Sequence, residues 1–305
     1  MTFCPICRET RAEHVAATPR AELVARWRRS FNIDISDELV GVDPVDEWRC
    51  PSCGLLFYAG AGAGSASLYE HLCRFSWYYL PTKWEHEMAI SDLRPGDRVL
   101  EVGCGAGAFV QRLVKAGVDA VGLELNEAAV AQARSVGIPV SGESIGAYAA
   151  AQPASCDMVC SFEVLEHVAD PYDFIEQQVR ALRVGGRLAI GVPNQDSYIR
   201  HEDDNLLNMP PHHVTRWSER ALRNLESVFP LRLSRVAREP LQRYHVRGYT
   251  RVLTAPLRRL ALPGRAMAWA LGGAAAQVLG RSGLHRRLTG QTIYACFERV
   301  RADQP

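Results

Sequence analysis

Short apolar runs alternate with amphipathic segments from residue 98 to residue 192. The run from Arg98 to Val102 ends in glycines, which is typical of a buried parallel strand that leads into a tight turn. Strands that alternate with helices in this way predict a doubly wound α/β sheet with right-handed crossovers. The expected strands are 98–102, 120–125, 157–162 and 187–192, and the expected helices are 109–116, 128–135 and 171–182.

Two further strands are expected at 231–236 and 292–299, and a long insertion separates them. The insertion, residues 240–290, contains no Asp or Glu, and its apolar residues are mainly Leu, Ala, Val and Trp. This composition predicts a basic, partly amphipathic helical segment. Its nine arginines are Arg243, Arg247, Arg251, Arg258, Arg259, Arg265, Arg281, Arg286 and Arg287.

A run of small residues at 59–67 predicts a flexible joint between two parts of the chain. The expected division is a cysteine-containing module at 1–60, a linker and helical lead-in at 61–92, and an α/β domain at 93–305. The aromatic segment 69–84 is expected to form the lead-in helix.

The net charge of +1 gives no overall field that would attract nucleic acid or an acidic partner. No uncharged apolar run reaches the roughly 18 residues that a transmembrane helix needs. The first residues are not a basic stretch followed by an apolar run, so no signal peptide is expected. A cytoplasmic, reducing location is therefore the expectation, with peripheral membrane contact through 240–290 as an addition.

Four of the nine cysteines form two CxxC pairs, Cys4 with Cys7 and Cys50 with Cys53. Such pairs in a reducing compartment bind metal more often than they form disulfides. Two CxxC turns together supply the four thiolates of a closed tetrahedral site, so a structural zinc is predicted. A redox pair or free buried thiols are the alternatives. The long spacer between the pairs is expected to hold a helix near residues 21–29.

A strand, a glycine-rich turn and a helix follow one another in the segment from Val99 to Phe109. Glycines let the backbone turn tightly and let a ligand approach it closely. Glu101 precedes the turn, and Glu124 ends the next strand, where an acid can accept hydrogen bonds from ribose hydroxyls. The GxGxG spacing differs from the GxGxxG of dinucleotide-binding folds, and an acid before the loop suits a cationic ligand.

The segment from Glu101 to Gly107 resembles motif I of class I S-adenosylmethionine-dependent methyltransferases, and Glu124 resembles their ribose-binding acid. Residues 156–162 resemble the fourth strand of that family, and residues 182–188 resemble the turn before its fifth strand. The resemblance covers about residues 94–193 and continues more loosely to residue 299. It implies a Rossmann-like, seven-stranded methyltransferase sheet, here with a small N-terminal zinc-binding module and a helical insertion near the C-terminus.

The resemblance also implies how S-adenosylmethionine is bound. The glycine loop would pack against its methionine part, with Glu101 near the amino group, Glu124 at the ribose and residues 142–145 beside the adenine. The expected cofactor-binding residues are Glu101, Gly103, Cys104, Gly105, Gly107, Glu124, Leu125, Glu143, Ser144 and Phe162.

Glu163, Glu166 and His167 follow the strand 157–162 at a spacing that would place them on one face of a helical turn. An ordered loop, 208–218, brings two prolines and the histidines His212 and His213. The same acidic segment lies beside the acceptor in ubiquinone-type O-methyltransferases. In small-RNA 2′-O-methyltransferases, two Glu, one His and a later His of this order bind a divalent metal. The expected catalytic residues are therefore His213, His167, Glu163 and Glu166. Three interpretations of this cluster stay open: a site for a divalent cation, a histidine base that works without metal, and a purely structural anchor.

The function expected first is methyl transfer to a small-molecule or carrier-linked acceptor, with transfer to oxygen. The N-terminal cysteine module and the segment PPHHVTRW at 210–217 resemble those of bacterial methyltransferases of sugar and secondary-metabolite pathways, and this resemblance implies such a pathway here. A metal-assisted RNA 2′-O-methyltransferase is the second candidate, although no basic, aromatic-interleaved groove supports it. A non-catalytic S-adenosylmethionine-binding module is the third. The insertion 240–290 is expected either to cap the acceptor pocket or to lie on an anionic membrane.

Overall fold

The computed structural model describes residues 2–75, 78, 80–202, 205–258 and 262–301. The side chains of residues 258, 262, 263 and 265 are not among the described parts. Three of the nine arginines expected on the insertion, Arg258, Arg259 and Arg265, therefore lie wholly or by their side chains outside them.

A seven-stranded sheet forms the centre of the α/β domain, in the order β10-β11-β8-β7-β4-β5-β6. The strands β6, β5, β4, β7 and β8 pair in parallel, and β11 pairs antiparallel with both β8 and β10. The doubly wound fold expected from the alternating pattern is confirmed. The strands are β4 (Arg98–Val102), β5 (Asp119–Leu123), β6 (Val140–Ser141), β7 (Cys156–Phe162), β8 (Leu182–Pro193), β10 (Leu231–Pro240) and β11 (Thr289–Arg299).

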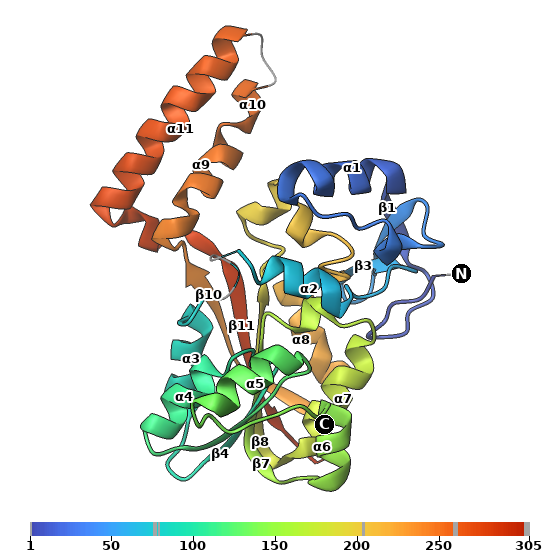
Figure 1. Ribbon diagram of the computed structural model, residues 1–305, viewed down its shortest axis with the longest axis vertical. Helices are drawn as coiled ribbons and strands as arrows, with labels where there is room; N and C mark the ends of the chain where they lie inside the picture. The colour runs from blue at the N-terminus through green and yellow to red at the C-terminus, as the bar shows by residue number, and fades with distance from the viewer. Residues whose placement is uncertain (1, 76–77, 79, 203–204, 259–261, 302–305) are drawn as a thin grey trace.

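Helices cover both faces of this sheet, and a separate apolar core lies under each face (Figure 1). One core receives side chains from α3 (Trp84–Asp92), α4 (Ala108–Lys115) and α5 (Glu127–Ser135). The other receives them from α6 (Ile145–Ala151), α7 (Pro171–Ala181) and α8 (Glu219–Arg223). The central strands are buried on both sides, which explains why their sequences read as continuous apolar runs.

The N-terminal region forms a second sheet of four strands in the order β1-β2-β3-β9. Three strands come from the first 59 residues, β1 (Glu13–Thr18), β2 (Val45–Arg49) and β3 (Leu56–Ala59). The fourth, β9 (Thr215–Arg216), belongs to the α/β domain. Helix α1 (Arg20–Phe31), expected near 21–29, packs Leu23 and Trp27 into this region's own core.

The expectation of one lead-in helix over 69–84 is wrong. Helix α2 (Ala66–Leu72) ends well before α3 begins at Trp84. Pro81 lies between them, and a proline in a helix interior lacks the N–H of the hydrogen bond and clashes with the preceding turn.

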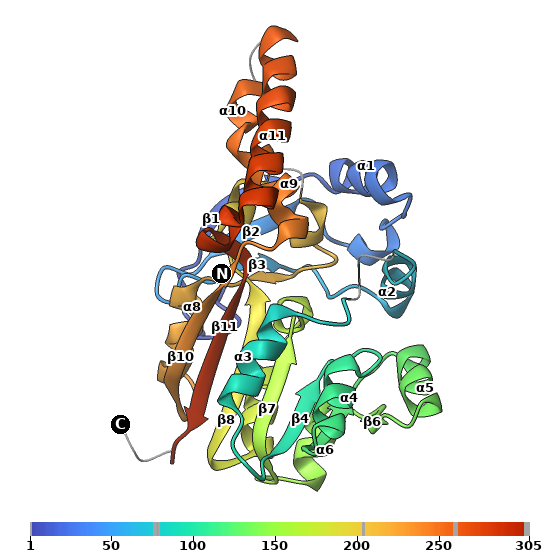
Figure 2. The ribbon, with the colours of Figure 1, turned by 90° about the vertical axis from the view of Figure 1, so that its left-hand side faces the viewer.

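The insertion is helical, as expected, and forms an arm of α9 (Val246–Leu253), α10 (Ala255–Arg258) and α11 (Leu262–Ser282). Figures 1 and 2 show the arm projecting away from the body, beyond the ends of β10 and β11. The arm therefore does not form the expected cap, because its described contacts with the body lie at its base, where Val246 of α9 packs with Tyr198, Ile199 and Leu241. The short turn η6 (Arg243–His245) leads into α9. Within the described residues, no helix combines the length and the apolar character needed to cross a bilayer.

Candidate active site

The glycine loop after β4 depends on backbone conformations that favour glycine. Gly103, Gly105 and Gly107 have φ angles of +74°, +54° and +75°. A Cβ on Gly103 would come within 2.5 Å of Val164 Cγ2, and one on Gly107 within 2.8 Å of Ile138 Cγ2. The loop is therefore closely packed against its neighbours, and side chains at these positions would strain it.

Glu101, at the end of β4, is a buried carboxyl group beside this loop. Its side chain is 5% exposed, and Oε2 has no hydrogen-bond partner among the described residues. Burial raises the pKa of Glu101 to about 8. A buried acceptor without a donor is costly, so this atom suits a ligand that brings a cationic or N–H group.

The acid at the end of the neighbouring strand, Glu124, supports the same loop. Its Oε2 accepts a hydrogen bond from the N–H of Gly105 at 2.8 Å, and its Oε1 accepts one from the N–H of Asn126 at 2.8 Å. Leu125, which follows it, is 71% exposed. Glu124 and Leu125 both follow β5, at the carboxyl edge of the parallel strands, where doubly wound sheets bind ligands.

Glu143 and Ser144 follow β6 at the same edge, and both make local contacts. Glu143 Oε1 accepts a hydrogen bond from the hydroxyl of Ser141 at 2.9 Å. The Ser144 hydroxyl accepts one from the N–H of Ala147 at 3.1 Å and so caps helix α6. These contacts order the loop that the resemblance assigns to adenine.

Two other residues expected at the cofactor lie closer to the core. The ring of Phe162 packs against His86 and Phe109, with centroid distances of 5.4 and 5.6 Å. Cys104 lies against Gly122, and burial raises the pKa of its thiol. Their roles at the cofactor stay predictions.

The segment after β7 departs from the expected helical turn. Glu163 has a φ of +57°, and only Leu165–His167 form a short 3₁₀ turn, η2. The expectation that Glu163, Glu166 and His167 share one helical face is therefore wrong for Glu163. Glu166 is nevertheless buried and Glu163 is half-buried, and burial raises the pKa of each carboxyl, in Glu166 to about 8.

His167, His213 and Glu166 converge on one point. Nδ1 of His167 lies 2.6 Å from the carbonyl oxygen of His212, and Nδ1 of His213 lies 3.2 Å from Asn208 Oδ1. If each Nδ1 carries the proton that these acceptors require, both Nε2 atoms present lone pairs. These Nε2 atoms lie 3.7 and 3.9 Å from Oε1 of Glu166.

Neither oxygen of Glu166 has a hydrogen-bond partner among the described residues, and Oε1 of Glu163 has none either. Burial also lowers the pKa of His167 and of His213, so both imidazoles are neutral. Among the described residues the cluster thus gathers imidazole lone pairs and carboxyl oxygens that receive no donor from outside the cluster. A cation that displaces the carboxyl protons would suit this arrangement.

His212 joins this group, although sequence reasoning named it only as part of the loop. Ligand atoms of His167, His212 and His213 all lie within 4.8 Å of one another. The hydroxyl of Tyr78 lies 3.0 Å from Nε2 of His212, and that of Tyr69 lies 3.1 Å from Nδ1 of His167. The doubled histidine in the sequence was a signal for His212, but neither tyrosine had one.

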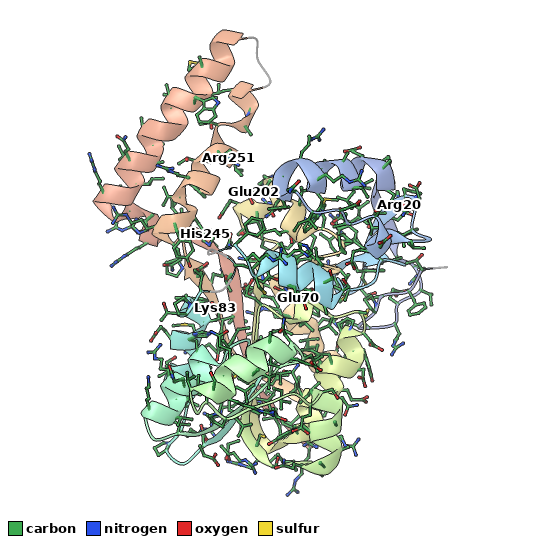
Figure 3. All side chains as sticks on the ribbon, viewed as in Figure 1. Arg20, Glu70, Lys83, Glu202, His245 and Arg251 are labelled. Carbon is green, nitrogen blue, oxygen red and sulfur yellow. The ribbon has the colours of Figure 1, made fainter. Side chains whose placement is uncertain are left out.

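Sequence reasoning also missed a charged group beside the site, Lys83. Nζ of Lys83 donates to the carbonyl oxygen of Phe162 at 3.3 Å, and Lys83 lowers the pKa values of Glu101 and Glu166 against the effect of burial. Figure 3 shows Lys83 between the sheet domain and the base of the arm. Glu85 and Glu239 are buried near it, and burial raises the pKa of both, in Glu239 to about 7.

The glycine loop and the Glu/His cluster are direct neighbours. The close approach of Val164 to Gly103 puts the segment 163–167 against the loop. The N–H of Val214 donates to the carbonyl oxygen of Glu166 at 2.8 Å and fixes the histidine loop to the same segment. The site therefore combines a glycine cradle, two strand-end acids and an acceptor-rich cluster at one sheet edge.

A family model described as a methyltransferase domain matches residues 76–226. This region contains the glycine loop, both strand-end acids and the Glu/His cluster. The chain contains a class I methyltransferase domain. Its sheet order and the placement of the loop agree with the fold and motif that the sequence predicted.

The chain is similar to ubiquinone biosynthesis O-methyltransferases. It is 36% identical to that of Methylococcus capsulatus over 106 residues, which are 33% of this chain and 45% of the relative. It is also 36% identical over 107 residues to that of Xanthomonas campestris, with the same coverage. The aligned region thus spans less than half of these relatives.

The methyltransferase domain shares its fold with solved methyltransferase structures. Among them is the complex between the Haloferax volcanii Trm112 methyltransferase activator and a methyltransferase. The match has a TM-score of 0.50 and 17% identity, and it covers 73% of this chain and 91% of that chain.

The four cysteines of the CxxC pairs lie close together in the N-terminal region. Sγ of Cys4 lies 3.6 Å from that of Cys53, and Sγ of Cys7 lies 3.5 Å from that of Cys50. All four are free thiols within 4.8 Å of one another. The contact with Cys53 lowers the pKa of Cys4 to about 5 and raises that of Cys53.

The cysteine cluster is joined to the histidine loop by backbone and side-chain contacts. Strand β3, which starts three residues after Cys53, pairs with β9, which starts two residues after His213. The guanidinium of Arg220 donates to the carbonyl oxygens of Pro51 and Ser52 at 2.6 and 2.7 Å. Arg216 pairs with Glu47 at 2.8 Å. The N-terminal region thus buttresses the loop that carries His212 and His213.

Proposed function

We propose that this protein transfers a methyl group from S-adenosylmethionine to a hydroxyl group of a small-molecule or carrier-linked acceptor. The observation that carries the proposal is the contact between the glycine loop and the acceptor-rich Glu/His cluster. The similarity to ubiquinone biosynthesis O-methyltransferases supports transfer to oxygen. It does not extend to the acceptor, which we place in the class of sugar or secondary-metabolite hydroxyls.

The residues at the sheet edge fit S-adenosylmethionine. The unpartnered Oε2 of Glu101 is an acceptor for the ammonium group of the methionine part, and the glycine loop admits its backbone. Glu124 accepts from the ribose hydroxyls with lone pairs beyond those used by Gly105 and Asn126. Exposed Leu125 and the segment 142–145 would flank the adenine. The cofactor supplies an electrophilic methyl group on a sulfonium.

The Glu/His cluster would orient the hydroxyl group that receives the methyl group and would take up the proton of that hydroxyl. The acceptor oxygen forms a bond to the methyl carbon as the carbon–sulfur bond breaks, and the electron pair remains on sulfur. The hydroxyl proton leaves to an acceptor of the cluster. Glu163, with its unpartnered Oε1, is available for this step. Catalysis otherwise rests on alignment of the two reactants.

We further propose that Glu166, His167 and His213 hold a divalent cation, with Glu163 beside it. The lone pairs of two imidazoles face one unpartnered carboxylate oxygen at 3.7 and 3.9 Å. When metal–ligand distances are about 2.1 Å, neighbouring ligand atoms of an octahedral ion lie about 3 Å apart. Side-chain shifts of less than about 1 Å would therefore bring these three atoms to ligand distances. A divalent cation lowers the pKa of a bound hydroxyl.

The Cys4, Cys7, Cys50 and Cys53 cluster fits a structural zinc ion. Four thiolates about 2.3 Å from a tetrahedral zinc lie about 3.8 Å apart. The two measured separations, 3.5 and 3.6 Å, are close to this value. The N–H of Cys53 also donates to Sγ of Cys50 at 3.5 Å. A backbone hydrogen bond of this kind within a CxxC turn stabilises a thiolate that binds a metal. The four sulfurs leave no open position, so the site is structural.

Isothermal titration with S-adenosylmethionine tests the cofactor assignment. Transfer of labelled methyl groups to phenols, sugar nucleotides and RNA, with and without Mn²⁺, then tests the acceptor class. We expect S-adenosylmethionine binding and transfer to a hydroxylated small molecule. Transfer to RNA alone would establish the nucleic-acid alternative, and binding without transfer to any acceptor would favour a non-catalytic module.

A further inference from the structure

The arm begins and ends at the same edge of the sheet as the active site. Strand β10 leads into it at Pro240, and β11 leads out of it at Thr289. Thr292 of β11 pairs with Pro193, the last residue of the parallel strand β8. The arm therefore leaves the body at the carboxyl edge, where the glycine loop and the Glu/His cluster lie (Figure 2).

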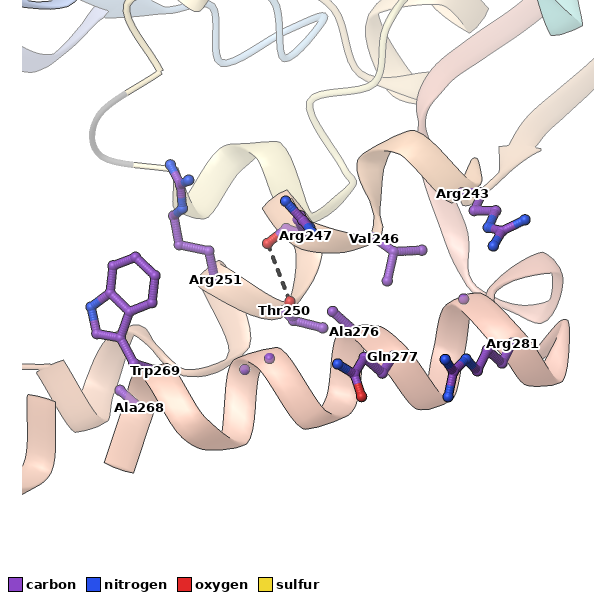
Figure 4. A pocket seen from close by; sticks show the side chains of 13 residues that line it. Arg243, Val246, Arg247, Thr250, Arg251, Ala268, Trp269, Ala276, Gln277 and Arg281 are labelled. Carbon is purple, nitrogen blue, oxygen red and sulfur yellow. Dashed lines mark hydrogen bonds between the residues drawn. The ribbon is translucent and has the colours of Figure 1, made fainter. Parts of the chain in front are cut away.

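A groove of about 640 Å³ lies between α9 and α11 of this arm. Arginine side chains from both sides line it, and no acid is among its lining residues. Figure 4 shows Arg243 and Arg281 at the end nearer to β10 and β11, with Gln277 beside Arg281. The lining arginines are Arg243, Arg247, Arg251 and Arg281.

The positive charge of the groove is only partly balanced. Residues 240–290 contain no Asp or Glu, so the arm offers no internal ion pair. Glu202 of the body is near Arg251, which lowers the pKa of this acid against the effect of burial. No ion pair among the described residues includes Arg243, Arg247 or Arg281. Like charges four residues apart repel, so an anion of more than one charge would stabilise the arm.

Helix α11 leaves the groove open where larger side chains would fill it. The helix contains four glycines, and three of them line the groove. A Cβ on Gly273 or on Gly280 would meet no atom within 4 Å. Glycine is unfavourable in a helix interior, so larger residues here would favour the helix and close the groove. The small residues that line the groove are Ala268, Gly272, Gly273, Ala276 and Gly280.

We propose that the groove binds the diphosphate group of a diphosphate-linked acceptor, whose hydroxyl group is methylated at the Glu/His cluster. The proposal rests on the methyl transfer proposed above and adds the chemical class of the acceptor. Planar guanidinium groups donate paired hydrogen bonds to phosphate oxygens. A diphosphate ester brings at least two negative charges to one place, which matches several arginines better than a single carboxylate does. The groove is also within the usual range of small-molecule sites, about 300–1,000 Å³.

The end of the groove at Arg243 is close to the acids of the active site. Tyr244 follows Arg243, and Glu85 and Glu163 are among the acids that add to the burial that raises the pKa of Tyr244. Glu85 packs on Gly191, where a Cβ would come within 3.2 Å of it, and the carbonyl oxygen of Gly191 accepts from the N–H of Glu163 at 2.8 Å. An acceptor with its diphosphate beside Arg243 would therefore extend past Tyr244 towards Glu163.

Calorimetric titration of the full chain tests the site, with inorganic diphosphate, UDP, farnesyl diphosphate and inorganic phosphate as probes. We expect the three diphosphates to bind more tightly than phosphate. In R243Q/R281Q their affinity should fall on the order of tenfold or more, because charge-assisted hydrogen bonds are lost. The control R286Q/R287Q removes two exposed arginines of the same segment that do not line the groove, and it should bind as the parent does.

Gly280→Leu fills the groove without a change of charge. We expect it to abolish diphosphate binding, and a less stable helix could not be the cause, because leucine favours a helix more than glycine does. Thermal unfolding verifies that each variant is folded, and each should keep the parent's affinity for S-adenosylmethionine. Tighter binding of UDP than of farnesyl diphosphate would assign a nucleotide-linked acceptor, and the reverse order a lipid-linked one.

Methyl transfer to paired compounds with and without the diphosphate, such as UDP-glucose and glucose, tests the link to the acceptor. We expect transfer to prefer the diphosphate-linked member, and R243Q/R281Q should raise its KM while kcat is kept. Equal transfer to both members overturns the acceptor assignment. Failure of the parent to bind any diphosphate overturns the site, as does an equal loss of affinity in R286Q/R287Q or binding of polyglutamate in place of diphosphate. Diphosphate binding without transfer to any hydroxylated compound would contradict the proposed function instead.

Discussion

The backbone N–H of Gly105 donates a 2.8 Å hydrogen bond to Oε2 of Glu124. This contact joins the glycine loop after β4 to the end of β5, so the acid assigned to the ribose also fixes the loop assigned to the methionine part. A positive φ at Gly105 turns this N–H toward Glu124. The two halves of the proposed cofactor site are therefore joined by a direct hydrogen bond.

We expect Glu124→Ala to weaken S-adenosylmethionine binding by about 1–3 kcal/mol, the scale of a lost hydrogen bond to a charged group. Calorimetric titration measures the change. Glu127→Ala, at the exposed start of α5, is the control and should bind normally. An unchanged affinity in Glu124→Ala would remove this residue from the cofactor site.

The sequence was a reliable guide wherever a local pattern determined the structure. The buried strands β4, β5, β7 and β8, the glycine loop and the meeting of the two CxxC pairs all follow from spacing and composition. Local patterns could not predict that Lys83, the N-cap of α3, and Glu85 of α3 reach the site, because their approach depends on how α3 packs against the sheet. The pairing of β3 with β9 joins residues far apart in the chain and gave no signal.

Two errors have specific causes. Glu163 was expected on a helical face, but its left-handed backbone makes only the three residues 165–167 helical. The insertion was expected as a cap because its apolar residues implied a buried face. The arm instead packs on the body only at its base, where Tyr198, Ile199, Leu241 and Val246 form a small core.

Glu101 makes the free energy of unfolding of the ligand-free protein depend on pH. Burial raises the pKa of Glu101 from 4.5 to about 8. The unfolded chain therefore releases this proton at a lower pH than the folded protein does. Its contribution to the free energy of unfolding should fall between about pH 4.5 and pH 8, by at most about 1.4 kcal/mol per pH unit.

Urea unfolding at pH 6 and at pH 8 measures this effect. In Glu101→Gln we expect a smaller loss of stability between the two pH values than in the parent. Glu70→Gln, which changes an exposed acid, should retain the parent's loss. If Glu101→Gln behaved like the parent, Glu101 would be ionised in the folded protein at pH 6.

His213→Ala and His167→Ala should each weaken Mn²⁺ binding, since each removes one of the ligands that face Glu166. Titration followed by electron paramagnetic resonance measures the affinity. We expect turnover to fall on the order of a hundredfold or more, with affinity for S-adenosylmethionine nearly unchanged. His14→Ala, on strand β1, is the control.

The outcomes of this experiment separate the interpretations of the cluster. Loss of turnover without any Mn²⁺ binding to the parent would indicate a histidine base that works without metal. Full turnover in His213→Ala would exclude both the base and the cation and leave the cluster a structural role.

Removal of the proposed zinc should destabilise the histidine loop of the active site, because β3 pairs with β9. We expect one zinc per chain in the purified protein, and none in the Cys50→Ser, Cys53→Ser double variant, by metal analysis. Because the metal contributes folding free energy, the N-terminal sheet of this variant should unfold first. Hydrogen exchange should then increase in residues 45–59 and also in 208–217, since β9 loses its partner strand.

Cys73→Ser, outside the cluster, should keep its zinc and its exchange pattern. A double variant that kept stoichiometric zinc would refute the ligand assignment. One that lost zinc but kept the 208–217 loop protected would show that the cysteine module does not support the histidines.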